Sequence, residues 1–163
     1  LGGYTTPPEF EATLTWPNGV RQIVRTTTDD SPYGQILRRE GQRNGVKFEG
    51  TSGWIWVNRA DLNASDESII DTPLPESPLR LPVSKDHMEN FFECVRSRQD
   101  PISPVEAGHR SASVGHLIVI ALRTGMKLTF DPVKEVFIGA NAKAGNAHLA
   151  RQMRKPYTYK MVG

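Results

Sequence analysis

The fold is decided by residues 84–130, which read SKDHMENFFECVRSRQDPISPVEAGHRSASVGHLIVIALRTGMKLTF. Ser84 is a good N-cap, and acidic residues in the first turn after it favour the helix dipole. Apolar residues then recur at the helical period i, i+3, i+4 and i+7, and Asp100-Pro101 ends the run. We therefore expect a first helix whose core face is formed by Met88, Phe91, Phe92 and Val95.

A second helix is predicted from Ser103-Pro104 to Gly125. Its start combines an N-cap Ser, a Pro at the first helical position and Glu106 at the capping-box position. Gly125 is expected in the left-handed conformation just past the helix end. The last two turns are apolar almost all round, through Leu117, Ile118, Ile120, Ala121 and Leu122. This pattern predicts burial on more than one face, between a sheet and the first helix.

Composition bounds the class of protein. The chain has 163 residues, 37% hydrophobic and 23% charged, which is enough for one domain with a core. The net charge is only +2 and the Lys and Arg residues are scattered along the chain, so we expect no nucleic-acid partner. No apolar run is long enough to span a membrane. A single cysteine, Cys94, excludes an internal disulfide framework. The first residues resemble neither a signal peptide nor a capped helix, so we expect a piece of a longer protein.

Two β-hairpins are predicted before the helices. Residues 9–16 alternate between apolar and polar, and Pro17-Asn18-Gly19 connects them to the β-branched run 20–28. Residues 46–51 and 54–59 form the second hairpin, about a turn at 52–53. Trp54 and Trp56 share one side of this hairpin and Ile55 and Val57 the other, so one face is free to pack against a second subunit.

The remaining segments give weaker signals. Residues 35–39 are expected as a short strand, and residues 60–83 as a long Pro-rich connection with one short helical turn within 63–70. Further strands are predicted at 127–130 and 136–138, and a short helix at 147–153, before a basic and aromatic tail. Together these elements predict one α+β domain over residues 1–163, with a largely antiparallel β-sheet and two main helices packed on one face.

The residues alone show no catalytic constellation. Glu106 and His109 have the i, i+3 spacing of di-iron bundles, but only one copy is present. His109 and His116 stand about 10 Å apart along one helix, too far to share a metal, so we expect no metal site. No Gly-x-Ser-x-Gly elbow or phosphate-binding glycine loop occurs. Trp16, Trp54, Trp56 and the tyrosine tail leave a carbohydrate-binding module open as an alternative, and the two-faced apolar sheet leaves open a dimerisation module.

Three motifs in order carry a family resemblance: VKFEGTSGWIWVNR at 46–59, the stretch from LPVSKDHM to LTFDP at 81–132, and ARQMRKPY at 150–157. Together they resemble the C-terminal part of the glucose-fructose oxidoreductase, inositol dehydrogenase and MocA (Gfo/Idh/MocA) family, and most of all its bacterial branch abundant in planctomycetes. The resemblance implies a parent with an N-terminal Rossmann domain that binds NAD or NADP. It also implies a sugar or polyol substrate and a homo-oligomer formed through the sheet.

The family's glycine fingerprint, its Glu-Lys-Pro motif and its Asp-x-x-x-His motif do not occur in this sequence. We therefore expect no bound cofactor and no catalytic residue here, and a domain that is inactive alone. Its partner would be the parent's Rossmann domain. Our candidates for substrate contact are Arg59, His87, His109 and Arg110, and our candidates for a subunit interface are Trp54 and Trp56.

Overall fold

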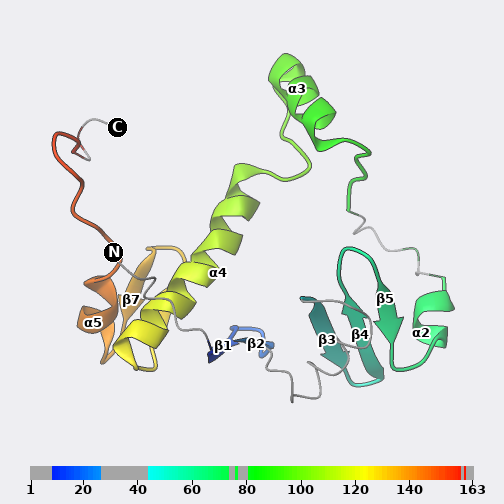
Figure 1. The fold of residues 1–163 in the computed structure, drawn as a ribbon, viewed down its shortest axis with the longest axis horizontal. Helices are drawn as coiled ribbons and strands as arrows, with labels where there is room; N and C mark the ends of the chain where they lie inside the picture. Colours follow the sequence, from blue (N-terminus) through cyan, green and yellow to red (C-terminus); the bar gives the residue numbers. More distant parts are fainter. Residues whose placement is uncertain (1–8, 27–43, 74–75, 77–80, 159, 161–163) are drawn as a thin grey trace. The chain divides into compact units, whose positions relative to one another are not determined.

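The computed structural model describes residues 9–26, 44–73, 76, 81–158 and 160. The chain divides into a helical unit, Leu1–Val24 with Met88–Gly163, and a hairpin unit, Arg25–His87. The described strands pair in small antiparallel sheets, and four helices accompany them, so the predicted α+β class is confirmed (Figure 1). No helix among the described residues combines the length and apolar character needed to cross a membrane.

The first predicted hairpin is present. Strands β1 (Glu11–Thr15) and β2 (Arg21–Arg25) pair, and alternate residues along each are half-buried. In the turn, the Gly19 N–H donates to the Trp16 carbonyl at 2.9 Å, and the Val20 N–H donates to Asn18 Oδ1 at 3.1 Å. Gly19 has φ of +84°, a conformation that glycine adopts without steric cost. The Pro-Asn-Gly signal therefore acts as predicted.

The two predicted helices are present, with different starts. Helix α3 spans His87–Ser97 and α4 spans Val105–Thr124. Ser84 is not the N-cap of α3, because the helix begins at His87, three residues later, and the Ser84 hydroxyl donates to the Asp86 carbonyl before the helix. The predicted capping box of α4 is also wrong, since Pro104 is the N-cap and no side chain caps it. The predicted end is confirmed: Gly125 is left-handed, with φ of +63°, and its N–H donates to the Ala121 carbonyl at 2.9 Å.

The core of the helical unit lies at the C-terminal end of α4. Ile118 and Ile120 of α4 are buried, as is Phe137 of β7 (Val136–Ile138), which pairs with β6 (Thr129–Asp131). The Phe137 ring meets Phe130 edge-on, with 5.3 Å between ring centroids. The apolar last two turns of α4 thus bury part of their surface as predicted.

A short helix, α5 (Ala142–Asn146), closes this core, and the helix predicted at 147–153 is wrong. The Asn146 side chain accepts from the Phe137 N–H at 2.8 Å and donates to the Phe137 carbonyl at 2.9 Å. Gly145 lies directly against the Phe137 ring. These contacts to β7 place the helix earlier than the local sequence pattern suggested.

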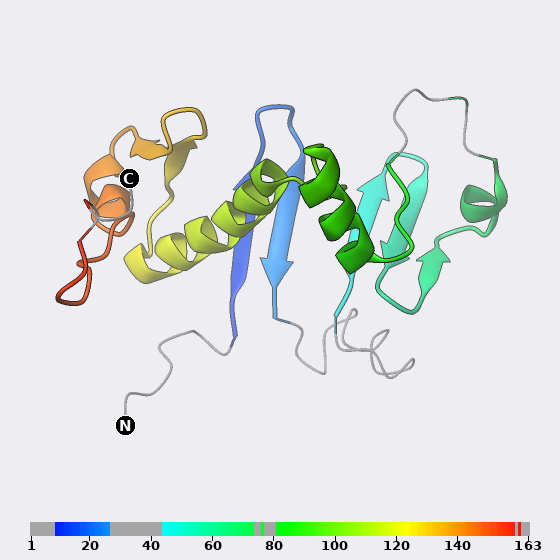
Figure 2. The ribbon, with the colours of Figure 1, turned by 90° about the horizontal axis from the view of Figure 1, so that it is seen from above.

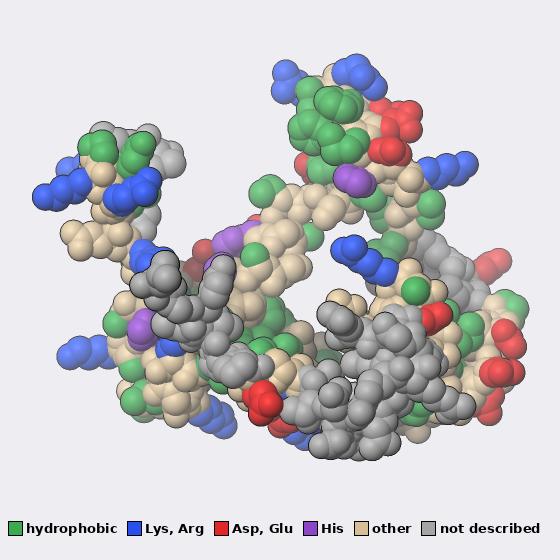
Figure 3. All heavy atoms as spheres, in the orientation of Figure 1, with side chains coloured by type: hydrophobic (Ala, Val, Ile, Leu, Met, Phe, Trp, Pro, Cys, Tyr) green, Lys and Arg blue, Asp and Glu red, His purple; other side chains and the backbone are tan. Residues whose placement is uncertain are grey.

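The predicted core face of α3 is not buried in the described structure. Met88, Phe91, Phe92 and Val95 are each about half exposed, and hydrophobic side chains gather on this helix in Figure 3. The expected burial of α4 against this helix is therefore not found among the described residues.

The hairpin unit contains the second predicted hairpin, β3 (Val46–Gly50) and β4 (Gly53–Val57), extended by a strand that the sequence did not indicate. This strand, β5 (Leu62–Ala64), pairs with β4, and the Ser65 N–H continues the pairing by donating to the Trp54 carbonyl. Helix α2 (Ser68–Asp71) is the helical turn expected within 63–70 and lies beside β5 (Figure 2). The strand predicted at 35–39 lies outside the described residues.

Candidate functional site

The exposed N-terminal half of α4 and the turn between β6 and β7 share a cluster of charged side chains. We name Glu106, His109, Arg110 and Glu135 the α4 ion cluster. His109 Nε2 lies 2.6 Å from Glu135 Oε1, and Arg110 Nη1 lies 3.4 Å from the same oxygen. Arg110 Nε donates to Glu106 Oε1 at 2.7 Å, one helical turn away. Figure 3 shows histidine and acidic side chains adjacent to each other in this region.

The turn between β6 and β7 presents Glu135 to the helix. Asp131 Oδ1 accepts hydrogen bonds from the Val133 and Lys134 N–H groups at 2.9 and 3.0 Å, which is typical of an Asx turn. The Arg110 Nη1 group donates to the Pro132 carbonyl at 2.6 Å and so ties the turn to α4. Glu135 itself has φ of +54°, an uncommon conformation for a residue with a side chain.

Hydrogen bonding dominates the electrostatics of this turn. The hydrogen bond from His109 lowers the pKa of Glu135, and the positive charge of Arg110 adds to the effect. The hydrogen bonds that Asp131 accepts from the Lys134 and Val133 backbone N–H groups lower the pKa of its carboxyl group. Both carboxylates are therefore ionised at neutral pH. The side chains of His109, Arg110 and Glu135 remain between 46% and 48% exposed, so a solute can reach them.

The hairpin unit carries the other two predicted contacts, Arg59 and His87. Arg59 lies at the exposed tip of the connection between β4 and β5. Asn58 shapes this tip, because its Oδ1 accepts from the Ala60 and Asp61 N–H groups at 2.8 Å each. His87 is the exposed first residue of α3. The structure thus brings together two of the four predicted residues, His109 and Arg110, on α4.

The two predicted interface tryptophans differ in exposure. Trp56 is 6% exposed, and Gly45 lies directly against its indole ring, so little of this side chain is open to a partner. Trp54 keeps more surface, and the Lys47 ammonium lies 4.9 Å from the centre of its ring, the geometry of a cation–π contact. Trp54 is therefore the stronger interface candidate of the two.

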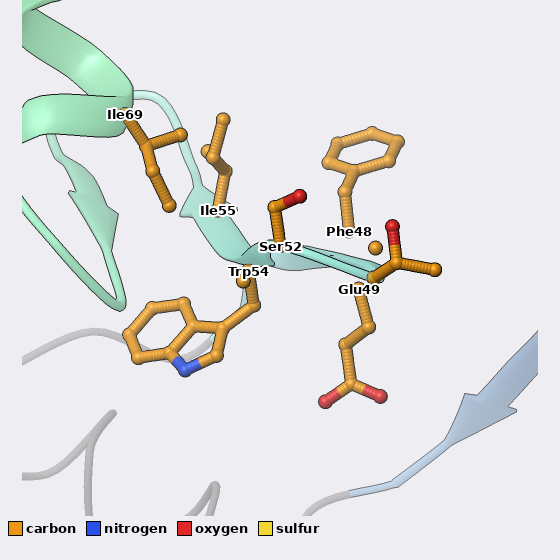
Figure 4. Close-up of a pocket in the computed structure, with 9 residues that line it drawn as sticks. Phe48, Glu49, Ser52, Trp54, Ile55 and Ile69 are labelled. Carbon is orange, nitrogen blue, oxygen red and sulfur yellow. The ribbon is translucent and has the colours of Figure 1, made fainter.

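A hollow of about 390 Å³ lies at the turn of the β3–β4 hairpin, beside α2. Phe48, Ile55 and Ile69 stand on one side of the hairpin ribbon, whereas Trp54 and Glu49 stand on the other (Figure 4). Because these side chains lie on opposite sides of the hairpin, they cannot all contact one bound molecule. The α4 ion cluster is thus the better candidate site.

A model of the oxidoreductase family C-terminal alpha/beta domain matches residues 13–159, which is most of the chain. The chain belongs to the Gfo/Idh/MocA oxidoreductase family. No curated protein and no solved structure matches it significantly.

Within this Gfo/Idh/MocA domain, two members of the α4 ion cluster, His109 and Arg110, were predicted as substrate contacts from the sequence, and Glu135 was not. The ion pair between Glu106 and Arg110 could be recognised from the sequence, since opposite charges at i and i+4 are neighbours on a helix. Glu135 could not be recognised in this way, because it is 26 residues from His109 in the sequence and contacts it only in the folded chain. Glu106 binds Arg110 rather than serving with His109 as a metal-binding pair. Among the described residues, no group of His, Cys, Asp and Glu side chains is arranged to hold a metal ion.

Proposed function

We propose that this domain forms the substrate side of an NAD(P)-dependent oxidoreductase that acts on sugars or cyclic polyols, and that it is inactive without a nucleotide-binding domain. On the motifs at 46–59, 81–132 and 150–157 we further place the protein in the planctomycete-like bacterial branch of the family. The family match over residues 13–159 supports an oxidoreductase parent. The homo-oligomer expected from the resemblance is part of the same proposal.

The observation that carries the substrate class is the α4 ion cluster. A sugar hydroxyl both donates and accepts hydrogen bonds, so a site that recognises several hydroxyls needs donors and acceptors side by side. Glu106 and Glu135 supply carboxylate acceptors, and His109 and Arg110 supply nitrogen donors, within 3.4 Å of one another along the cluster. Among the described residues, His109 Nδ1 and Arg110 Nη2 have no hydrogen-bond partner. These two groups are available to a substrate.

The proposal is tested by calorimetric titration of the full chain with two series of compounds. Hexoses and cyclic polyols should bind, and Arg110→Met should abolish their binding, because Met keeps an unbranched apolar stem but removes the guanidinium and its hydrogen-bond donors. Lys143→Met is the matched control, since Lys143 lies on α5 outside the cluster. NAD(H) and NADP(H) should not bind. Micromolar binding of either nucleotide would contradict the claim that cofactor affinity belongs to another domain.

The apolar face of α3 favours a second candidate function, a dimerisation module without a redox role. Its four large apolar side chains are each 50–53% exposed, and the occupant would be a second copy of the chain. Sedimentation should then show a dimer that Phe92→Asp converts to a monomer, while Glu93→Gln on another face of α3 leaves it intact. A wild-type monomer at high concentration would exclude this function. If the domain is instead a carbohydrate-binding module that uses Trp16 and Trp54, added sugar should change the tryptophan fluorescence of the chain.

A further inference from the structure

His109 and Arg110 are consecutive residues on α4, and consecutive side chains on a helix point about 100° apart. Nevertheless both reach the same atom, Glu135 Oε1, at 2.6 and 3.4 Å. Two further acceptors fix the guanidinium, since Arg110 also donates to Glu106 and to the Pro132 carbonyl. The carboxylate of Glu135 therefore draws together two side chains that the helix alone would keep apart.

We propose that Glu135 is a positioning residue, which orients His109 and Arg110 for hydroxyl groups of the substrate. The inference rests on the proposed function and deepens it. An ionised carboxylate can only accept hydrogen bonds, so the Nε2 atom of His109 must carry the hydrogen that it donates to Glu135. In the neutral imidazole, Nδ1 is then left as an acceptor. One substrate hydroxyl donates to His109 Nδ1, and a neighbouring hydroxyl accepts from Arg110 Nη2.

The backbone of the turn sets the direction of this carboxylate. Glu135 holds a left-handed φ of +54°, and Asp131 fixes the residues before it through its bonds to the Val133 and Lys134 N–H groups. Strained backbone that persists in a fold is held by its surroundings, and it occurs preferentially where a side chain must be aimed. Here the side-chain contacts to His109 and Arg110 provide that hold.

Two substitutions separate the reach of Glu135 from its charge. Glu135→Asn is one methylene shorter and tolerates positive φ, so it removes the contact without imposing new backbone strain. Glu135→Gln keeps the reach and offers an amide oxygen to His109 Nε2–H, so it should rescue part of the effect. Lys134→Gln is the matched control in the same turn, because only the backbone N–H of Lys134 takes part in the turn's hydrogen bonds. Circular dichroism verifies that each variant folds.

The first readout is the hydrogen position on His109, measured from long-range ¹H–¹⁵N correlations of the full chain above the ordinary histidine pKa. The wild type and Lys134→Gln should show the Nε2–H form, and Glu135→Asn a mixture of both forms. The second readout is calorimetric titration with myo-inositol and D-glucose. Glu135→Asn should weaken binding about three- to tenfold, the value of roughly one net hydrogen bond, and Glu135→Gln should weaken it less.

An unchanged Nε2–H form in Glu135→Asn would overturn the positioning role, as would sugar binding of wild-type strength in that variant. Failure of the proposed function is distinguishable. If the wild-type chain binds neither compound while the hydrogen position still depends on Glu135, the substrate class is refuted and the control of His109 by Glu135 is upheld.

Discussion

The contact between Gly145 and Phe137 makes a sharp prediction about stability. A Cβ added at Gly145 would lie 2.5 Å from two carbons of the Phe137 ring, well inside normal contact distance. The ring has little freedom to yield, because Phe137 is 3% exposed and its ring also packs against Phe130. Gly145→Ala should therefore destabilise the helical unit even though alanine is the better helix former.

The expected size follows from two opposing terms. Overpacking of a core costs about 1–3 kcal/mol, and the 2.5 Å approach to ring carbons places this site in the upper part of that range, about 2–3 kcal/mol. Replacing a helical glycine by alanine gains at most about 1 kcal/mol, so the net loss is about 1–2 kcal/mol. The assay is amide hydrogen exchange at Phe137, whose N–H donates to Asn146 Oδ1 and so reports on this contact. A loss of that size corresponds to roughly five- to thirtyfold faster exchange.

Gly108 provides the matched control. It lies in α4, and a Cβ built there meets nothing within 4 Å, so Gly108→Ala should stabilise the helix by about 0.5–1 kcal/mol. The two identical substitutions are thus predicted to have opposite signs. If Gly145→Ala slows exchange at Phe137, or matches Gly108→Ala in sign, then the packing of α5 on β7 described above is incorrect.

Three further predictions test other parts of the structure. Asn146→Ala removes both side-chain bonds to Phe137 and should cost about 1–3 kcal/mol in urea denaturation, whereas a loss below this range would show that water replaces the amide. Gly125→Ala places a side chain in the left-handed conformation and should lower stability by about 1–2 kcal/mol, with unchanged stability counting against the assigned end of α4. Glu135 should make the free energy of unfolding depend on pH, because its pKa is lower in the folded state than in the unfolded state. Its contribution to stability is present above the unfolded-state pKa and is lost as the pH falls through the folded-state pKa. The acid limb of thermal unfolding should therefore be shallower in Glu135→Gln, and an identical limb in both proteins would refute the hydrogen bond to His109.

The elements that sequence reasoning predicted correctly are those fixed by local chemistry. The hairpin at Pro17-Asn18-Gly19 and the end of α4 at Gly125 each depend on a glycine that adopts positive φ. Such positions can be recognised from a few neighbouring residues, because only glycine takes these conformations without cost. The apolar last turns of α4 were likewise readable from the helical period.

The elements that were missed depend on contacts between distant residues. The strand β5 is only three residues long and exists through pairing with β4, and α5 is held by the bonds of Asn146 to Phe137 nine residues away. The capping pattern at Ser103 failed for a related reason, since Glu106 binds Arg110 instead of the start of the helix. Glu135 enters the candidate site only because the β6–β7 turn lies against α4.

Binding of a polyhydroxylated substrate by the α4 ion cluster can be observed directly at the histidine side chains of the full chain while myo-inositol is added. His148 lies after α5, outside the cluster, and serves as the internal reference. We expect a saturable change in the ¹⁵N shifts of His109, lost in Arg110→Met, with the His148 shifts constant. No change at His109, or equal changes at both histidines, would contradict it.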